Sequence, residues 1–156
     1  MTTIPSKYLE IFAPFMHEPS IDVLACAKAV GLPIYSEDLP PRVSGMIKRI
    51  SDDSFECYVA RNEPNVRQRF TAAHELGHFV LHRDSIGQTL TDNYLLRAEG
   101  MTNTQETQAN YFAADLLMPY NLISEAIDGG VTDVGDLAKL FDVSEIAMSI
   151  RLGLPT

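Results

Sequence analysis

The sequence predicts an α+β fold in which a small sheet of about three strands packs on several helices. Two strand-like runs, residues 43–50 and 54–60, are separated only by a short turn, so they are expected to pair antiparallel. Helical patterns precede this pair and follow it. The 156 residues, 46% hydrophobic and 21% charged, are enough for one folded domain, expected to span residues 1–156.

A helix and an extended segment are predicted before the two strands. In residues 20–30 apolar side chains recur at helical spacing, and Ser20 is placed to cap the helix. Gly31 and Pro33 end the helix, and Pro33 begins the extended segment. The strand at 54–60 alternates apolar residues with more polar ones, which is typical of a strand with one buried face.

Residues 62–81 predict a long helix after the strands. Asn62 is placed to cap it, and Pro64 suits its first turn. An apolar stripe runs along one side of this helix and comprises Val66, Phe70, Ala73, Gly77 and Val80. At about 100° per residue, His74 and His78 point away from the stripe, on a separate polar face.

The segment His74-Glu75-Leu76-Gly77-His78 has the H-E-x-x-H pattern of zinc metalloproteases. Histidines four residues apart on a helix lie one turn apart, so both imidazoles can reach one metal ion. Glu75 is displaced around the helix, where it can activate a metal-bound water instead of binding the metal. The pattern therefore predicts a zinc-dependent hydrolase.

A catalytic zinc needs a third protein ligand, for which the sequence offers three candidates. His82 lies too far along the same helix to converge easily with the other two histidines, and His17 lies between prolines near the N-terminus. Glu106 begins a predicted helix that ends at Pro119, and this helix could bring it to the metal. Alternatively, Glu106 could form a capping box with Asn103. The residues alone leave both interpretations open.

The overall charge argues against several classes of partner. A net charge of −9 and a pI near 4.7 oppose binding to a phosphate backbone, so no direct contact with nucleic acid is expected. Residues 136–152 are spaced like a helix-turn-helix but carry few basic side chains, and we interpret them as part of the packed protein body and not as a DNA-binding element.

The sequence lacks a signal peptide pattern and a membrane-spanning stretch, and Cys26 and Cys57 are expected to be buried thiols. Together these features predict a cytoplasmic protein.

Two sequence blocks resemble the ImmA/IrrE family of zinc metallopeptidases. The first is the motif helix from Gln68 to His78, and the second is the Glu-x-x-Ala-Asn-x-Phe-Ala-Ala-x-Leu-Leu-Met-Pro block of residues 106–119. The resemblance extends over about residues 20–153, so residues 1–19 are expected to form an N-terminal extension. It implies a zincin-like fold with a helical C-terminal region.

The resemblance also implies the composition of the site. It makes His74, His78 and Glu106 the ligands of one Zn²⁺ and Glu75 the catalytic base. The arrangement is similar to that of gluzincins, where a residue four positions after the ligand glutamate steadies a ligand histidine. Asn110 occupies that position, and we expect its side-chain carbonyl to accept a hydrogen bond from one of the two histidines.

Family members are found with helix-turn-helix repressors of the Xre type. The resemblance therefore implies an endopeptidase that cuts such a regulator, supplied in trans by another chain. The alternative is a non-proteolytic antirepressor or toxin–antitoxin partner that binds the regulator and keeps a structural metal. A further hypothesis is that the substrate adds as a strand to an edge at residues 55–60.

Overall fold

The computed structural model describes residues 2–156 of the chain. In these residues it contains seven α-helices, two short 3₁₀ helices and four strands. The elements are, in chain order, α1 (Ser6–Phe12), η1 (Ala13–Phe15), α2 (Val23–Ala29), β1 (Ile34–Glu37), β2 (Val43–Ser51), β3 (Ser54–Ala60), α3 (Asn65–Leu81), η2 (Arg83–Ser85), β4 (Thr89–Asn93), α4 (Asn103–Leu117), α5 (Tyr120–Asp128), α6 (Val134–Phe141) and α7 (Glu145–Arg151).

The four strands form one mixed sheet in the order β1-β3-β2-β4. The hairpin β2–β3 and the pair β2–β4 are antiparallel, whereas β1 is parallel to β3. The α+β prediction is confirmed, with one strand more than expected, because β4 lies in a stretch without obvious periodicity. The hypothesis of a substrate on residues 55–60 is wrong, since β3 lies between β1 and β2 and both of its edges are already paired.

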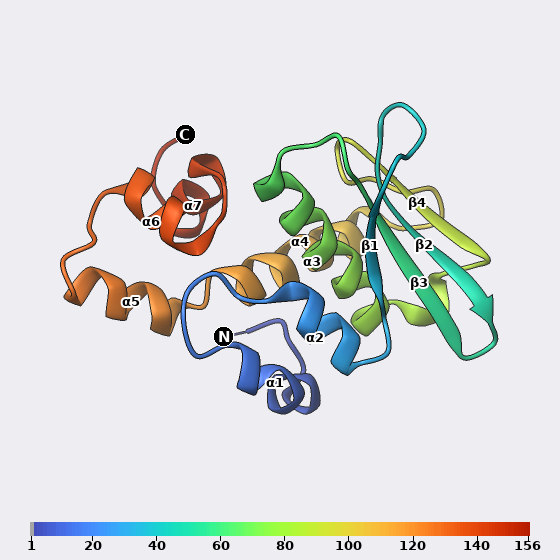
Figure 1. Ribbon diagram of the computed structural model, residues 1–156, viewed down its shortest axis with the longest axis horizontal. Helices are drawn as coiled ribbons and strands as arrows, with labels where there is room; N and C mark the ends of the chain where they lie inside the picture. The colour runs from blue at the N-terminus through green and yellow to red at the C-terminus, as the bar shows by residue number, and fades with distance from the viewer. Residues whose placement is uncertain (1) are drawn as a thin grey trace.

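The long helix α3 lies at the centre of the molecule, with the sheet on one side of it (Figure 1). Helix α4 packs along α3, and α5 to α7 gather at the end of the molecule opposite the sheet (Figure 1). The two central helices approach closely at Gly77, where an added Cβ would lie only 3.1 Å from the ring of Phe112. A glycine at this position therefore sets the distance between the two helices that carry the site.

Two of the predicted helix starts differ from the structure. Helix α2 is capped by Asp22, whose carboxylate accepts a hydrogen bond from the Ala25 amide at 3.0 Å, and Ser20 instead adopts a left-handed conformation. Helix α3 begins directly after Pro64, without a side-chain cap, so Asn62 lies outside it. The fixed φ angle of proline suits a helix start and replaces the contribution expected from a cap.

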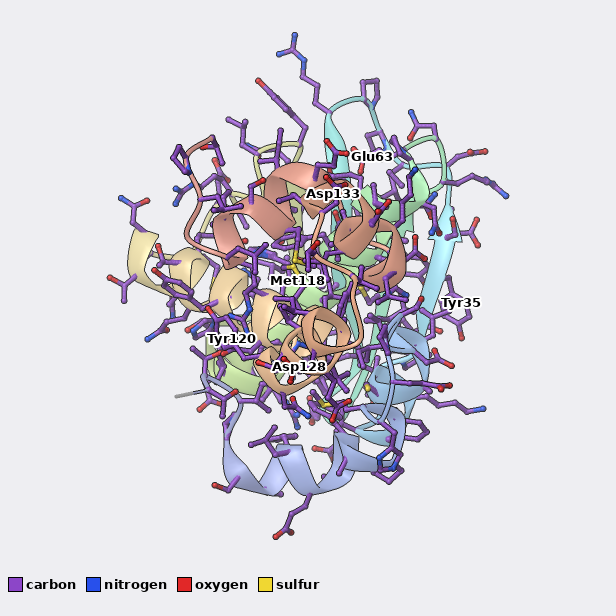
Figure 2. All side chains as sticks on the ribbon, turned by 90° about the vertical axis from the view of Figure 1, so that its left-hand side faces the viewer. Tyr35, Glu63, Met118, Tyr120, Asp128 and Asp133 are labelled. Carbon is purple, nitrogen blue, oxygen red and sulfur yellow. The ribbon has the colours of Figure 1, made fainter. Side chains whose placement is uncertain are left out.

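The hydrophobic core extends through the whole described chain. Phe12 from the N-terminal segment and Phe141 and Met148 from the C-terminal helices belong to the same buried cluster as the centre of α3. Met118, at the end of α4, lies in the interior near the C-terminal helices, whereas Tyr35 lies at the surface on the sheet side (Figure 2). None of the helices in residues 2–156 combines the length and the apolar character needed to cross a membrane.

Candidate metal centre

Helix α3 places His74, Glu75 and His78 in the interior of the protein. All three side chains are fully buried, as is the whole stretch of residues 71–79. The face that carries them is polar in composition, as expected, but it meets the sheet and α4 instead of solvent. Burying three ionisable groups is costly unless each finds a partner of opposite charge or a metal ion.

Helix α4 brings Glu106 to the two histidines. Its Oε1 atom lies 2.6 Å from Nε2 of His78 and 3.4 Å from Nε2 of His74. The other oxygen, Oε2, accepts a hydrogen bond from the Ala98 amide at 2.6 Å. The sequence had also allowed Glu106 to form a capping box with Asn103, and this interpretation is wrong.

The helix start has a different capping box. Thr102 accepts a hydrogen bond from the Gln105 amide at 3.1 Å, and the Gln105 side chain accepts one from the Thr102 amide at 2.9 Å. The donors at the start of α4 are thereby satisfied one residue earlier than the alternative had assumed. The carboxylate of Glu106 is left free to point into the cluster.

A fourth acidic side chain, Asp92 on β4, also reaches the cluster. It is fully buried, and its Oδ1 atom lies 3.7 Å from Nε2 of His74. One ligand atom each from His74, His78, Asp92 and Glu106 lie within 4.8 Å of one another. The sequence did not reveal Asp92, because Leu90 is the only apolar residue of Thr89 to Asn93, whereas in the structure Leu90 and Asp92 share the buried face of β4.

The donor set and its unsatisfied atoms fit a divalent metal ion. His74 Nε2, both oxygens of Asp92 and both oxygens of Glu75 are buried without a hydrogen-bond partner. A tetrahedral zinc site with bonds of about 2.1 Å has edges of about 3.4 Å. The separations of His74 Nε2 from Glu106 (3.4 Å) and from Asp92 (3.7 Å) are close to this value, whereas His78 Nε2 and Glu106 Oε1 lie at a hydrogen-bond distance of 2.6 Å. Two imidazoles with carboxylates suit zinc, and the same donors also bind other divalent ions.

Hydrogen bonds orient the imidazole rings of both histidines. His74 Nδ1 donates to Oδ1 of Asn110 at 2.8 Å, which confirms the contact expected for Asn110 and turns Nε2 towards the cluster. On the other histidine, Nδ1 of His78 lies 2.9 Å from Nδ1 of His82. The opposite nitrogen of His82, Nε2, donates to Oε1 of Gln108 at 2.7 Å. His82 thus contacts His78 and does not itself reach the cluster, and exposed His17 takes no part in it.

The charges of the cluster are strongly coupled. Burial acts to lower the pKa of His74, but the nearby carboxylates of Asp92 and Glu106 outweigh it and raise the pKa to about 9. Burial likewise acts to raise the pKa of Glu106, but His74 and His78 lower it to about 2. For Glu75, burial and then the negative charge of Asp92 raise the pKa well above its usual range.

Strand β2 passes close to Glu75 at Gly45. A Cβ at this glycine would lie 2.7 Å from Cγ2 of Thr71 and 3.3 Å from the carboxyl carbon of Glu75. The absence of a side chain therefore makes room for Glu75 between α3 and the sheet.

A large cavity adjoins the cluster. It has a volume of about 520 Å³ and is lined mainly by apolar side chains of α3, α4 and α7. Asn110, which contacts His74, forms part of its wall, and so does Leu96 from the segment after β4.

Comparisons with known proteins agree with this geometry. The sequence model of the IrrE N-terminal-like domain, peptidase family M78, matches residues 46–153, which include α3, β4 and α4. The radiation response metalloprotease IrrE of Deinococcus radiodurans is 36% identical over 87 residues, which are 55% of this chain and 26% of that protein. This chain thus spans about a quarter of the length of the curated relative.

A solved structure shares the fold. It is a Mycobacterium tuberculosis transcriptional regulator, which superposes with a TM-score of 0.65 over 95% of this chain and 45% of its own, at 20% sequence identity. The family match covers well over half of the chain and contains the two helices that carry the cluster. The protein therefore belongs to the ImmA/IrrE family of metallopeptidases.

Proposed function

We propose that this protein is a zinc-dependent endopeptidase in which His74, His78 and Glu106 hold the metal and Glu75 is the catalytic base. The observation that carries the proposal is the convergence of two imidazole nitrogens and a carboxylate from two helices beside the buried, unpartnered carboxyl group of Glu75. This arrangement agrees with the H-E-x-x-H pattern, whose chemistry is metal-assisted hydrolysis.

The metal and Glu75 have different proposed roles in peptide hydrolysis. When bound, zinc supplies a Lewis acid that polarises a peptide carbonyl and lowers the pKa of a coordinated water to about 7. Glu75 then accepts a proton from the attacking water and returns it to the leaving amine. Burial raises the pKa of its carboxyl group, and a nearby divalent cation opposes this effect by favouring the ionised form that the base requires.

The proposed substrate is a protein, and specifically a helix-turn-helix regulator of the Xre type supplied in trans in the cytoplasm. The negative net charge of this chain supports a basic partner, because complementary charges speed encounter. Strand β4 is the sheet edge nearest the cluster, and a substrate segment would pair there as an additional strand.

The test is proteolysis by the zinc-loaded chain and its Glu75→Gln variant. Both are incubated with Xre-type repressors of the same organism and with a peptide library, and the fragments are identified by mass spectrometry. We expect cleavage by the parent, a loss of about 10²-fold or more in Glu75→Gln, and full activity in Glu10→Gln, an exposed control on α1. Relief of repression by Glu75→Gln without fragments would reject the peptidase.

A metal assay tests the ligands separately. Glu106→Ala should lose most of its zinc affinity, and a variant that retains full zinc would overturn the assignment of Glu106. Equilibrium competition with a chromogenic chelator gives this affinity without any need for a substrate.

One observation favours the non-proteolytic alternative, an antirepressor or toxin–antitoxin partner with a structural metal. Structural zinc sites have four protein ligands, and Asp92 offers a fourth donor 3.7 Å from His74. A structural site does not need a base, however, so the buried Glu75 beside the cluster supports the enzyme.

A further inference from the structure

The carboxylate of Asp92 adds a fourth protein donor to the cluster, whereas a catalytic zinc needs three protein donors and one open position. Both of its oxygens are buried and have no hydrogen-bond partner, and one of them belongs to the group of four donor atoms that lie within 4.8 Å of one another. The remaining three donors already form a complete protein ligand set for a catalytic zinc. The position of Asp92 therefore needs an explanation of its own.

The chain that follows Asp92 contacts two side chains of the cluster or their backbone. Residues 94–101, here called the strap, fold back so that Ala98 forms a β-bridge with Asp92 on the outer edge of β4. The amide of Ala98 donates to Glu106, and the side chain of Arg67 donates to the carbonyl of Tyr94. The strap is thus fixed to both central helices and occupies the strand edge next to the metal centre.

In this conformation the cluster is closed to solvent. His74, Glu75, His78 and Asp92 are each 0% exposed and Glu106 is 1% exposed. A peptide cannot reach Glu75 in this conformation, because the side chain is 0% exposed. The arrangement described here is therefore incompatible with catalysis.

We propose that Asp92 is a fourth, removable metal ligand that keeps the enzyme latent, and that the strap must lift from β4 to withdraw it. In the closed form Asp92 takes the coordination position that a catalytic water needs. When the strap lifts from β4, the bridge from Ala98 no longer holds Asp92, so its side chain can turn away from the metal, and the same movement uncovers the strand edge. This inference rests on the proposed function only in that the latent activity is peptide hydrolysis.

The conformation of the strap fits a segment that is held closed by its contacts. Leu96 has a left-handed backbone with φ of 54°, which is unfavourable for a residue with a branched side chain. Its side chain is nevertheless 4% exposed, because it packs inward beside the large cavity. Packing at Leu96 thus offsets local strain, and loss of the neighbouring contacts favours release.

The geometry of Asp92 also supports a weaker bond than those of the other ligands. Glu106 is ordered by the Ala98 amide, and His74 by Asn110. Asp92 has no such support for its free oxygen. A ligand that is not held by a further hydrogen bond is the one expected to leave first.

The experiment uses the full chain loaded with Co²⁺, whose visible absorption reports coordination, and acetohydroxamate as the competing small ligand. We expect the parent to bind acetohydroxamate weakly, because Asp92 must be displaced. Asp92→Ala should bind it about tenfold or more tightly, corresponding to about 1.4 kcal/mol, and its Co²⁺ spectrum should differ before any addition. Thr91→Ala, an exposed position on the same strand, should behave like the parent.

The isosteric variant Asp92→Asn controls for the possibility that Asp92→Ala disturbs folding. It should lie between the parent and Asp92→Ala, and circular dichroism of the metal-free proteins verifies the fold. Identical Co²⁺ spectra and identical acetohydroxamate affinities in the parent and both well-folded variants would overturn the proposal.

The strap is tested from outside the metal cluster. Arg67→Ala removes the hydrogen bond to the Tyr94 carbonyl. We expect a several-fold gain in acetohydroxamate affinity and faster hydrogen exchange at the Ala98 amide. No change in either quantity would overturn the role of the strap.

The Co²⁺ spectra and the acetohydroxamate affinities test the removable Asp92 ligand separately from the peptidase activity, because neither measurement requires a substrate. If the Co²⁺ and acetohydroxamate results are as expected but neither the parent nor Asp92→Ala cuts any protein, the proposed function is wrong, whereas the assignment of Asp92 as a removable ligand is supported. If the parent cuts proteins and the Asp92 variants show no change in Co²⁺ spectrum or acetohydroxamate affinity, Asp92 is not a removable ligand, whereas the proposed function is supported.

Discussion

The Nδ1 atoms of His78 and His82 lie 2.9 Å apart, and this contact fixes which nitrogen of His78 is free to bind a metal. The oxygen of Gln108 accepts a hydrogen bond from His82 Nε2, so this nitrogen of His82 carries the proton. In the tautomer with this proton on Nε2, His82 accepts at Nδ1, and His78 donates from its own Nδ1. The Nε2 lone pair of His78 is thereby directed into the cluster.

Loss of this orientation should weaken metal binding. We expect Gln108→Ala to lower zinc affinity by about tenfold, because His82 is no longer held in the tautomer that accepts from His78. Chelator competition measures the change, and Thr104→Ala is the matched control on the exposed side of α4. An unchanged affinity in Gln108→Ala would show that Gln108 does not determine the tautomer of His82.

A similar argument applies to His74, the other proposed ligand. Asn110→Ala removes the acceptor for His74 Nδ1 and should cost about 10- to 100-fold in zinc affinity. Asn110→Asp keeps an oxygen acceptor at the same place and should restore most of the loss. If the aspartate variant bound zinc as poorly as the alanine variant, packing and not the hydrogen bond would be responsible.

Gly45 should be intolerant of even one added methyl group. Gly45→Ala places a Cβ 2.7 Å from Cγ2 of Thr71, so we expect a loss of about 1–3 kcal/mol in the free energy of unfolding, measured in urea. Thr71→Ser removes that Cγ2 and should recover much of the stability when combined with Gly45→Ala. A double variant no more stable than Gly45→Ala would contradict this steric explanation.

The metal-free protein should lose stability in alkaline solution. Burial opposes the protonated form of His74, but Asp92 and Glu106 raise its pKa from 6.5 to about 9. A raised folded pKa stabilises the fold fully below the unfolded value, and this stabilisation disappears as the pH rises through the folded pKa. The free energy of unfolding should therefore fall by about 3 kcal/mol between these two values.

Urea unfolding on either side of this pH window measures the effect. His74→Gln has no proton to lose at this position and should show a flatter profile. In the zinc-loaded parent the metal replaces the proton on His74, so the decline should also be smaller there. A metal-free parent whose stability does not change across the window would refute the prediction.

The sequence carried most of the information about the two helices. Histidines one helical turn apart and a glutamate between them are defined by local periodicity, so the spacing of His74 and His78 was enough to place them together. Glu106 was harder, because its role depended on which residue capped α4. Only the structure showed that Thr102 and Gln105 form the box, one position away from the alternative.

The strand β4, its residue Asp92 and the strand order could not be predicted from local periodicity in the same way. Strand β4 has five residues, and the aspartate at its inward position is typical of a turn, so neither the strand nor Asp92 was predicted. Pairing with β2, across a long separation in sequence, overrides this local preference. For the same reason the middle position of β3 was not foreseen, since strand order is a tertiary property.

The two central helices meet at the site with opposite ends, since His78 lies in the last turn of α3 and Glu106 in the first turn of α4. The helix dipole favours a cation at the first position and an anion at the second, so the backbone itself supports the pairing of these two side chains. The cluster is thus preorganised by charge before any ion arrives. We therefore expect the metal-free protein to keep its fold, so that the proposed zinc could be removed with a chelator and restored without refolding.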